Sequence, residues 1–172
     1  MTSHPNQQQS IQYLTFHLAG AEYAVGILNV KEIIEYGTLI KIPKTPPTIR
    51  GVINLRGKVV AVVDLALKFG MVASPVTART CIVMVEVEIN DTRTVMGIIA
   101  DSVSQVISLS HDDILPAPSF GTRVRIDFLH GMGRSGDKFV LILDIEKVLS
   151  AEDIPPAAAS VGAVELAAEA QT

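Results

Sequence analysis

The chain has 172 residues and is acidic overall, with a net charge of −4, a pI of about 5.5 and no tryptophan. Its Lys and Arg residues are scattered and aromatic residues make up only 5%, which excludes the basic footprint and stacking side chains of nucleic-acid binders. No apolar run approaches the ~18 residues of a membrane span, and the polar N-terminus lacks the order of a signal peptide. We therefore expect a cytoplasmic protein of one domain or two small ones, without membrane insertion.

The first structured region is predicted to be β. Alternation with period two begins around Leu14 and resumes around Tyr23 after a short turn, which predicts a hairpin. The apolar spacing of residues 27–34 suits one helical turn that leads into another strand. The proline-rich segment 43–47 predicts a connector, because proline cannot donate to a sheet ladder.

The central segment, residues 51–63, consists of two apolar runs around a turn that carries Arg56 and Gly57. This pattern predicts a tight hairpin, because Gly57 tolerates the positive φ that such a turn needs. Asp64 follows at once and Gly70 ends the next run, so we expect a short helix that the aspartate caps.

The second half of the chain repeats this plan. Residues 82–100 predict another hairpin, and Ser110 with Asp113 three residues on resembles a capping box. Residues 131–145 match the central hairpin, with three of its residues recurring 80 positions later as Gly131, Lys138 and Asp144. Because such repeats usually mean repeated structural units, we predict an all-β fold of two small barrels that share an apolar seam.

The residue types that carry chemistry form no reactive constellation. The histidines lack metal-ligand spacing and Cys81 is the single cysteine, so we expect neither a metal site nor an intrachain disulfide. Asp64 and Asp144 could be paired catalytic carboxylates, but their shared place between a strand and a short helix is explained by capping. The glycines from residue 131 match a dinucleotide loop only loosely, because an apolar strand follows them. We expect no catalytic residue and no cofactor.

Two polar residues of the central hairpin, Asn54 and Arg56, are not required by a strand or a turn. They and Glu32 could be ordinary exposed residues. Alternatively, Glu32 and Arg56 meet at the mouth of the first barrel and form a recognition surface, with apolar contacts beside them from Val30, Val52 and Leu55. Arginine suits such a surface because its planar guanidinium group fixes a carboxylate or backbone partner in orientation.

Parts of the sequence resemble the signature of the CheW family of chemotaxis coupling proteins. The segments that carry the resemblance are Tyr23–Ile33, Arg50–Gly57 and Val62–Leu65, and the likeness extends from about Ile11 to Leu149. The run Asn54-Leu55-Arg56-Gly57 is highly specific in this setting. Ala61 stands where the family usually has proline, and Gly26 stands where aspartate is common. Neither departure lies at the polar turn.

The resemblance implies two tandem, interleaved, five-stranded SH3-like β-barrel subdomains, roughly residues 11–78 and 79–150. Residues 1–10 and the Ala-rich tail 151–172 are expected to be disordered. The implied function is that of an adaptor between methyl-accepting receptors and the histidine kinase CheA, whose regulatory domain has the same fold. Barrel-end contacts between the two proteins would build arrays at the membrane, and receptor tips would dock near the groove between the subdomains. The positions that correspond to the family's coupling region are Val30, Glu32, Gly51, Asn54, Leu55, Arg56 and Gly57.

Three alternatives stay open. A CheW-like protein could serve another receptor–kinase pathway, such as surface motility. A small-molecule-binding barrel would need an enclosed cavity with convergent polar groups, and a hydrolase would need Asp64 or Asp144 to act on a substrate. Because the sequence predicts barrels filled by side chains and aspartates that cap helices, we expect a protein that binds other proteins.

Overall fold

The computed structural model describes residues 10–117 and 124–154, and strands make up most of them. The strands are β1 (Ser10–Leu18), β2 (Ala21–Gly26), β3 (Val30–Glu35), β4 (Ile49–Leu55), β5 (Lys58–Val63), β6 (Cys81–Ile89), β7 (Thr92–Ala100), β8 (Ser102–Ser110), β9 (Ile114–Leu115), β10 (Leu129–Ser135) and β11 (Lys138–Leu143). Short helical turns lie between them: α2 (Leu65–Lys68), α3 (Ile145–Val148), η1 (Ile27–Asn29), η2 (His111–Asp113), η3 (Ile126–Phe128) and η4 (Ala151–Asp153). The prediction of an all-β protein is confirmed.

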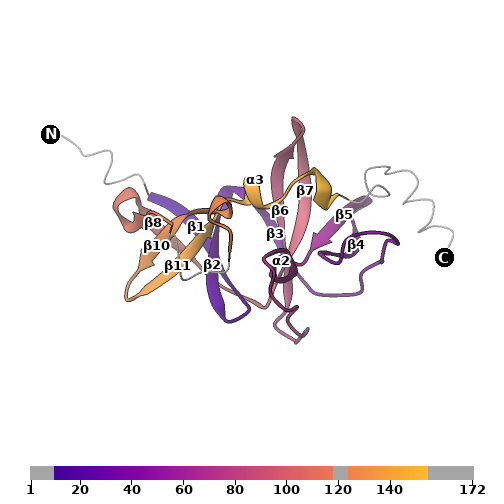
Figure 1. Cartoon of the computed structure of the whole chain (residues 1–172), viewed down its shortest axis with the longest axis horizontal. Coiled ribbons are helices and arrows are strands. Elements are labelled where there is room, and N and C mark those ends of the chain that lie inside the picture. The colour runs from indigo at the N-terminus through magenta and orange to yellow at the C-terminus, as the bar shows by residue number, and fades with distance from the viewer. Residues whose placement is uncertain (1–9, 118–123, 155–172) are drawn as a thin grey trace.

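The strands form two sheets that lie side by side (Figure 1). Sheet A has the order β8-β1-β2-β11-β10-β9, and sheet B has the order β3-β6-β7-β5-β4. In each sheet one parallel pairing joins two antiparallel hairpins, β2 with β11 in sheet A and β7 with β5 in sheet B. A bridge between Ile40 and Val52 in sheet B takes the place that β9 has beside β10. The two SH3-like subdomains therefore repeat one plan, as the internal repeat predicted.

The two sheets are not formed by the first and second halves of the chain. Sheet B uses consecutive strands within residues 30–100, whereas sheet A combines β1 and β2 with strands that begin at residue 102. The two sheets therefore do not follow the predicted limits of roughly 11–78 and 79–150. The physical reason is the parallel pairing of β2 with β11: parallel strands need a long crossover, and here it contains all of sheet B. The predicted number of five strands is correct for sheet B. Sheet A has six strands, because the two-residue strand β9 is added to it.

The limits predicted for the disordered ends also need correction. Ser10 pairs with Ser110 in the ladder between β1 and β8. At the other end, residues 151–153 form η4, in which Asp153 is buried and forms an ion pair with Lys68 of α2. A buried carboxylate needs such a partner, so the ordered chain continues beyond residue 150. The rest of the two predicted segments, residues 1–9 and 155–172, lies outside the described residues.

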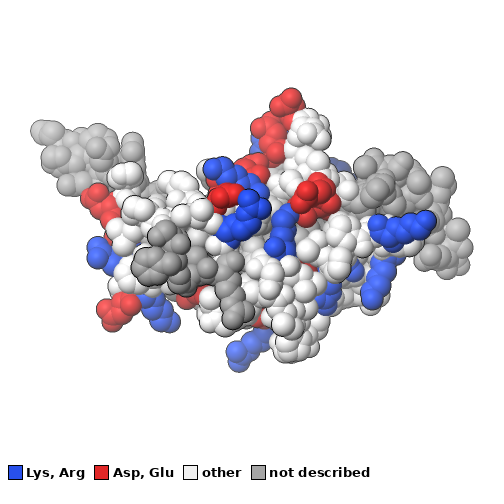
Figure 2. Space-filling model, in the orientation of Figure 1, with Lys and Arg blue, Asp and Glu red and all other residues white. Residues whose placement is uncertain are grey.

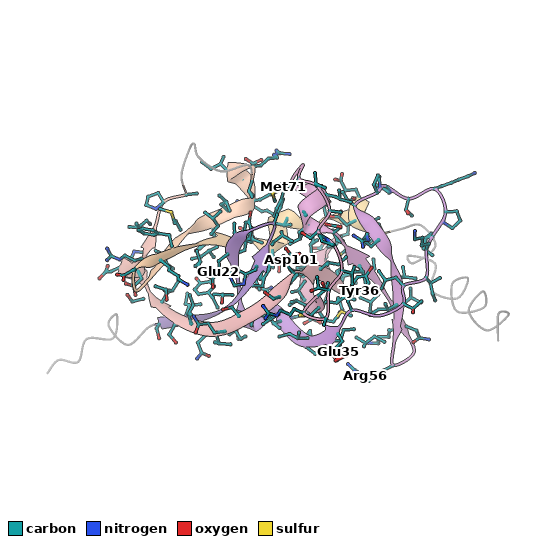
Figure 3. The ribbon with its side chains drawn as sticks, turned by 90° about the horizontal axis from the view of Figure 1, so that it is seen from below. Glu22, Glu35, Tyr36, Arg56, Met71 and Asp101 are labelled. Atoms are coloured by element: carbon teal, nitrogen blue, oxygen red, sulfur yellow. The ribbon has the colours of Figure 1, made fainter. Side chains whose placement is uncertain are left out.

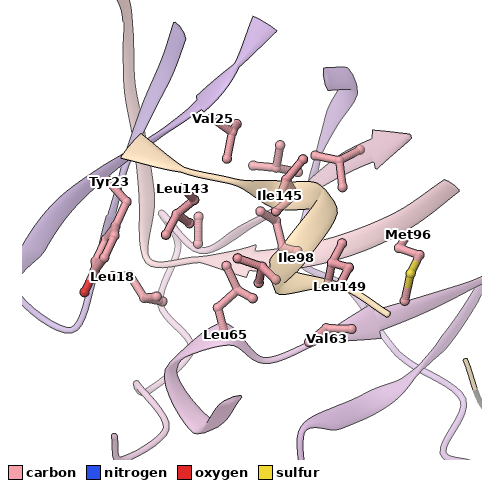
Figure 4. Close-up of a cluster of buried hydrophobic side chains, with 14 of the residues drawn as sticks. Leu18, Tyr23, Val25, Val63, Leu65, Met96, Ile98, Leu143, Ile145 and Leu149 are labelled. Atoms are coloured by element: carbon pink, nitrogen blue, oxygen red, sulfur yellow. The ribbon is translucent and has the colours of Figure 1, made fainter. Parts of the chain in front are cut away.

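The largest cluster of buried apolar side chains is shared by both sheets (Figure 4). Leu18, Tyr23 and Val25 enter it from sheet A, while Val63 and Ile98 enter it from sheet B. The helical turns α2 and α3 add their buried side chains to the same cluster. Each fully buried side chain of this kind contributes about 1.5–3 kcal/mol. The predicted apolar seam is thus present, and it fixes the two subdomains against each other.

Each subdomain contains a glycine that a neighbouring carbonyl group approaches closely. Gly51 of β4 has φ +151°, and a Cβ atom there would lie 2.7 Å from the carbonyl oxygen of Ile40. A Cβ atom at Gly131 of β10 would lie 2.8 Å from the carbonyl oxygen of Leu115. Both glycines also sit beside a register shift in their hairpins. The repeat therefore preserves a packing requirement as well as a turn pattern.

We predict that Gly51→Ala lowers the free energy of unfolding by about 2–3 kcal/mol, because a side chain there is strained and meets backbone atoms. Urea unfolding measures the change. Gly37→Ala is the matched control, since Gly37 has open space around its Cβ position and no positive φ. That variant should stay within about 1 kcal/mol of the parent. Equal stability of the two variants would contradict the close approach of Ile40 to Gly51.

Candidate functional site at the Arg56 turn

The turn between β4 and β5 is held in one conformation by its own residues. Arg56 and Gly57 both have positive φ, at 52° and 87°, as a two-residue type I′ hairpin turn requires. The Oδ1 atom of Asn54 accepts a hydrogen bond of 2.8 Å from the backbone N–H of Gly57. This contact explains a polar residue that neither strand pattern nor turn pattern required. Asn54 and Gly57 fix the turn, and Arg56 projects from it at the edge of the molecule (Figure 3).

Arg56 is bound to Glu32 of β3, as the sequence-based hypothesis proposed. Its Nη2 atom donates to Oε1 of the carboxylate in a short contact, and Nη1 lies 3.4 Å from Oε2. The strands β3 and β4 are the two edges of sheet B, so the ion pair links the opposite edges of one curved sheet. The side chain of Arg56 is nevertheless 71% exposed, and that of Glu32 is 30% exposed. The pair therefore closes the mouth of the subdomain without being buried.

The ion pair sets the charge of the carboxylate. The hydrogen bond from Arg56 holds the pKa of Glu32 below its ordinary value, and the same contact raises the pKa of Arg56. Because the pKa of Glu32 is lower in the folded state, the pair stabilises the fold above the unfolded pKa. That contribution is lost as the pH falls through the lowered value. Near neutral pH the turn presents a fixed guanidinium group whose partner is ionised.

The three remaining residues predicted for this site are buried or half-buried and make packing contacts. Val30 is half-buried and packs against the shared core. Leu55 is half-buried against the smaller cluster within sheet B. Gly51 is buried beneath Ile40. The structure thus brings Glu32, Asn54, Arg56 and Gly57 together at the surface. It places Val30, Leu55 and Gly51 mainly among packing contacts.

Sequence reasoning missed an ion pair that anchors the same hairpin. Arg50 of β4 donates from Nη1 to Oδ2 of Asp64 at 2.6 Å, and its Nη2 lies 3.3 Å from the hydroxyl oxygen of Tyr36. Asp64 also accepts a hydrogen bond of 3.2 Å from the backbone N–H of Leu67, which confirms its predicted capping role. The separation of Arg50 and Asp64 in the sequence matches neither a helix nor a strand period, so the sequence did not indicate the ion pair. The pairing of β4 with β5 brings the two residues together.

The capping prediction is wrong for the side chain of the equivalent residue in sheet A. Asp144 precedes α3, but its carboxylate makes no hydrogen bond to the backbone of that turn. Its nearest cation is Lys147, with Nζ 4.0 Å from Oδ2. The repeat preserves the residue and its place in the chain, but it does not preserve the side-chain hydrogen bond to the following turn.

The part of the chain that the structure describes also shows whether it contains a metal site, a membrane-spanning helix or a basic surface. Within residues 10–117 and 124–154, no group of three His, Cys, Asp or Glu side chains could hold a metal ion. No helix of these residues is long and apolar enough to cross a bilayer. Lys and Arg are dispersed among Asp and Glu on the face in view (Figure 2). One exposed charged group that the described residues hold in a fixed position is the guanidinium group of the Arg56 turn.

Comparisons with known proteins give the family. The family model described as CheW-like domain matches residues 12–153. "Chemotaxis protein CheW" of Klebsiella aerogenes is 37% identical over 143 residues, which cover 83% of this chain and 84% of that protein. The protein of the same name from Treponema pallidum is 27% identical, over 85% of this chain and 86% of its own. The crystal structure of the scaffolding protein TtCheW from Thermoanaerobacter tengcongensis superposes with a TM-score of 0.72 and 31% identity, covering 81% of this chain and 92% of that one. This chain belongs to the CheW family.

We predict that Arg56→Met raises the pKa of Glu32 toward its ordinary value, because the hydrogen bond that lowers it is removed. Carboxyl-carbon NMR titration measures the change. Arg93→Met is the matched control, because Arg93 is another exposed arginine, 3.0 Å from Glu86. It should shift the titration of Glu86 and leave that of Glu32 alone. An unchanged Glu32 titration in Arg56→Met would show that the ion pair does not form in solution.

Proposed function

We propose that this protein is the adaptor that couples methyl-accepting chemotaxis receptors to the histidine kinase CheA, and that the Arg56 turn is part of its recognition surface. The observation that carries the proposal is a charged guanidinium group held outward on a rigid hairpin in a chain of the CheW family. The adaptor acts by binding and not by catalysis. Asp64, which a hydrolase would need, is buried and engaged by Arg50.

The turn is suited to binding because it is fixed before a partner arrives. The backbone of Arg56 is set by the hairpin and its side chain is oriented by Glu32. An arginine has five N–H donors, so further donors are left for a carboxylate or carbonyl group of a partner. Pre-organisation of this kind reduces the ordering cost of association.

Coupling follows if the adaptor touches receptor and kinase at once. A receptor state that favours one arrangement of the complex then biases the kinase equilibrium, with a coupling free energy of ~1–3 kcal/mol. Contacts that must form and rearrange suit micromolar affinity, about −8 kcal/mol. We place the kinase contact on the regulatory domain of CheA, which presents barrel ends of the same kind. The receptor tip lies near the groove between the subdomains, and repeated barrel-end contacts recruit the protein from the cytoplasm into receptor arrays.

A second assignment, to a small-molecule-binding barrel, has one observation in its favour. An open polar cavity of about 310 Å³ lies beside β1 and β8, with His17, Glu22 and Lys138 among its lining residues. This volume is at the lower limit of ligand pockets, which are also mostly apolar. The coupling function is therefore the better supported assignment. A role in another receptor–kinase pathway would use the same surface.

We predict that Arg56→Glu leaves the protein folded but reduces its ability to activate CheA with receptors at least about tenfold, as loss of a central interface arginine does. Melting curves and a reconstituted CheA autophosphorylation assay give the two readouts. The fold should survive because the side chain is 71% exposed and exposed pairs add little to stability.

Arg93→Glu is the matched control for this experiment. Arg93 is 76% exposed and pairs with Glu86 on the same sheet, so its reversal changes the net charge equally. It should leave kinase activation near that of the parent. Unfolding of Arg56→Glu would make Arg56 an internal strut, and equal loss in both variants would make the effect one of overall charge. Either result rules out the Arg56 turn as a specific contact.

A further inference from the structure

The mouth of sheet A that corresponds to the Arg56 end of sheet B contains an open cavity. Its volume is about 310 Å³, and it lies among β1, β2, β8 and the turn between β10 and β11. Figure 3 shows one of its lining residues, Glu22, among the strands of sheet A and well away from Arg56. The lining includes none of the residues predicted for coupling, all of which the structure describes. A role for this cavity is therefore separate from the function proposed for the Arg56 turn.

The cavity lies on the inward face of sheet A, beyond its apolar filling. Ala24 of β2 and Val140 of β11 belong to a buried apolar cluster within this sheet. Side chains two positions apart on a strand point to the same face, so Glu22 and Lys138 face the same interior as this cluster. Both of them line the cavity. Apolar side chains therefore fill one end of the subdomain interior, and charged side chains stand at the other end.

Sheet B shows how the same space is filled by apolar side chains. Given the repeat of 80 positions between β5 and β11, the parallel pairings place Glu22 at the position that Val95 has in β7. The ladders of the two hairpins then place Thr15 at the position of Met84. Met84 is fully buried, and Val95 packs against the same apolar cluster of sheet B. A carboxylate and a hydroxyl group in their places leave sheet A with a polar cavity instead of a closed apolar end.

Two opposite charges that line the cavity lack a close partner. The side chain of Glu22 is only 15% exposed, and the Nε2 atom of His17 lies 4.0 Å from its Oε1 atom. The Nδ1 atom of His17 is in turn 3.3 Å from Oγ of Ser102. Lys138 is exposed and forms no ion pair with another described residue. A largely buried carboxylate is costly unless it is satisfied, so the carboxylate of Glu22 is available to a cation in the cavity.

We propose that this cavity binds a small molecule that carries both an ammonium and a carboxylate group, as an α-amino acid does. The ammonium group of the ligand lies at the carboxylate of Glu22, and its carboxylate lies at the ammonium group of Lys138. Val140 neighbours Glu22 across the parallel pairing of β2 with β11. Lys138 is two positions before Val140, which is about 7 Å along the strand, and a ligand of a few heavy atoms spans that distance. Such a site adds to the adaptor function and does not replace it.

Other ligands match the lining poorly. A simple anion such as phosphate would face the carboxylates of Glu22 and Asp137, which both line the cavity. A metal ion lacks ligands, because no three His, Cys, Asp or Glu side chains of the described residues could hold one together. A drug-sized ligand needs a larger and mostly apolar pocket. The presence of one available carboxylate and one available ammonium group therefore favours a small zwitterion.

The test uses the full chain and measures affinity by isothermal titration calorimetry, with NMR chemical shifts to locate the site. Each of the common L-amino acids serves as a probe, up to millimolar concentration. At least one should bind saturably and shift the resonances of Glu22 and Lys138. The amine that lacks its carboxylate and the acid that lacks its amino group should each bind at least about tenfold more weakly, because each loses one charged contact.

Two variants of the protein remove the same contacts from the other side. Glu22→Gln and Lys138→Met should each weaken binding of that amino acid about tenfold. Glu86→Gln is the matched control for the first, because the side chain of Glu86 is 19% exposed and lies outside the cavity. Lys58→Met is the matched control for the second, since Lys58 is the counterpart of Lys138 in the repeat. Both controls should bind like the parent, and melting curves should show all four variants folded.

The proposal is overturned if no amino acid binds, if the amine or the acid binds as tightly as the amino acid, or if a control variant loses as much affinity as its counterpart. Should Glu22→Gln unfold, Lys138→Met decides, because that side chain is exposed. The affinities are measured without receptor or kinase, so the outcome is independent of the experiment on Arg56.

Discussion

The packing of one sheet against the other through a single apolar cluster is the constraint on which the rest of the structure depends. Sheet B is complete within one stretch of chain, whereas sheet A must be assembled from both ends of the chain around it. The parallel pairing of β2 with β11 requires a long crossover connection, and that connection contains all of sheet B. Side chains such as Val25 and Ile98, from different sheets, meet in that cluster, so folding of the two subdomains is coupled.

A core of this kind leaves the polar residues free for surface roles. The ion pair between Glu32 and Arg56 joins the edge strands of sheet B at the surface, where its net contribution to stability is small. By contrast, the buried pair between Lys68 and Asp153 ties the last described turn to α2 and is part of the fold. The two pairs show how burial separates a structural ion pair from one whose charge is available to a partner.

Local features were predictable from the sequence because they depend on neighbouring residues. Alternation identified the hairpins, and the position of Asp64 identified its cap. The sequence left open whether Glu32 and Arg56 meet or are ordinary exposed residues, and the structure shows that they form an ion pair at the surface. Strand pairing across the chain was not predictable, because period-two patterns do not specify a partner strand.

Reversal of the ion pair tests the central claim most directly, because it preserves the link between β3 and β4 while moving the guanidinium group. The double variant Glu32→Arg with Arg56→Glu should melt near the temperature of the parent, since two opposite charges still face each other across the mouth of sheet B. If a partner recognises the guanidinium group at the turn, CheA activation with receptors should remain as low in the double variant as in Arg56→Glu. Recovery of full activation would contradict the claim, and would show that the pair serves only to hold the edge strands together.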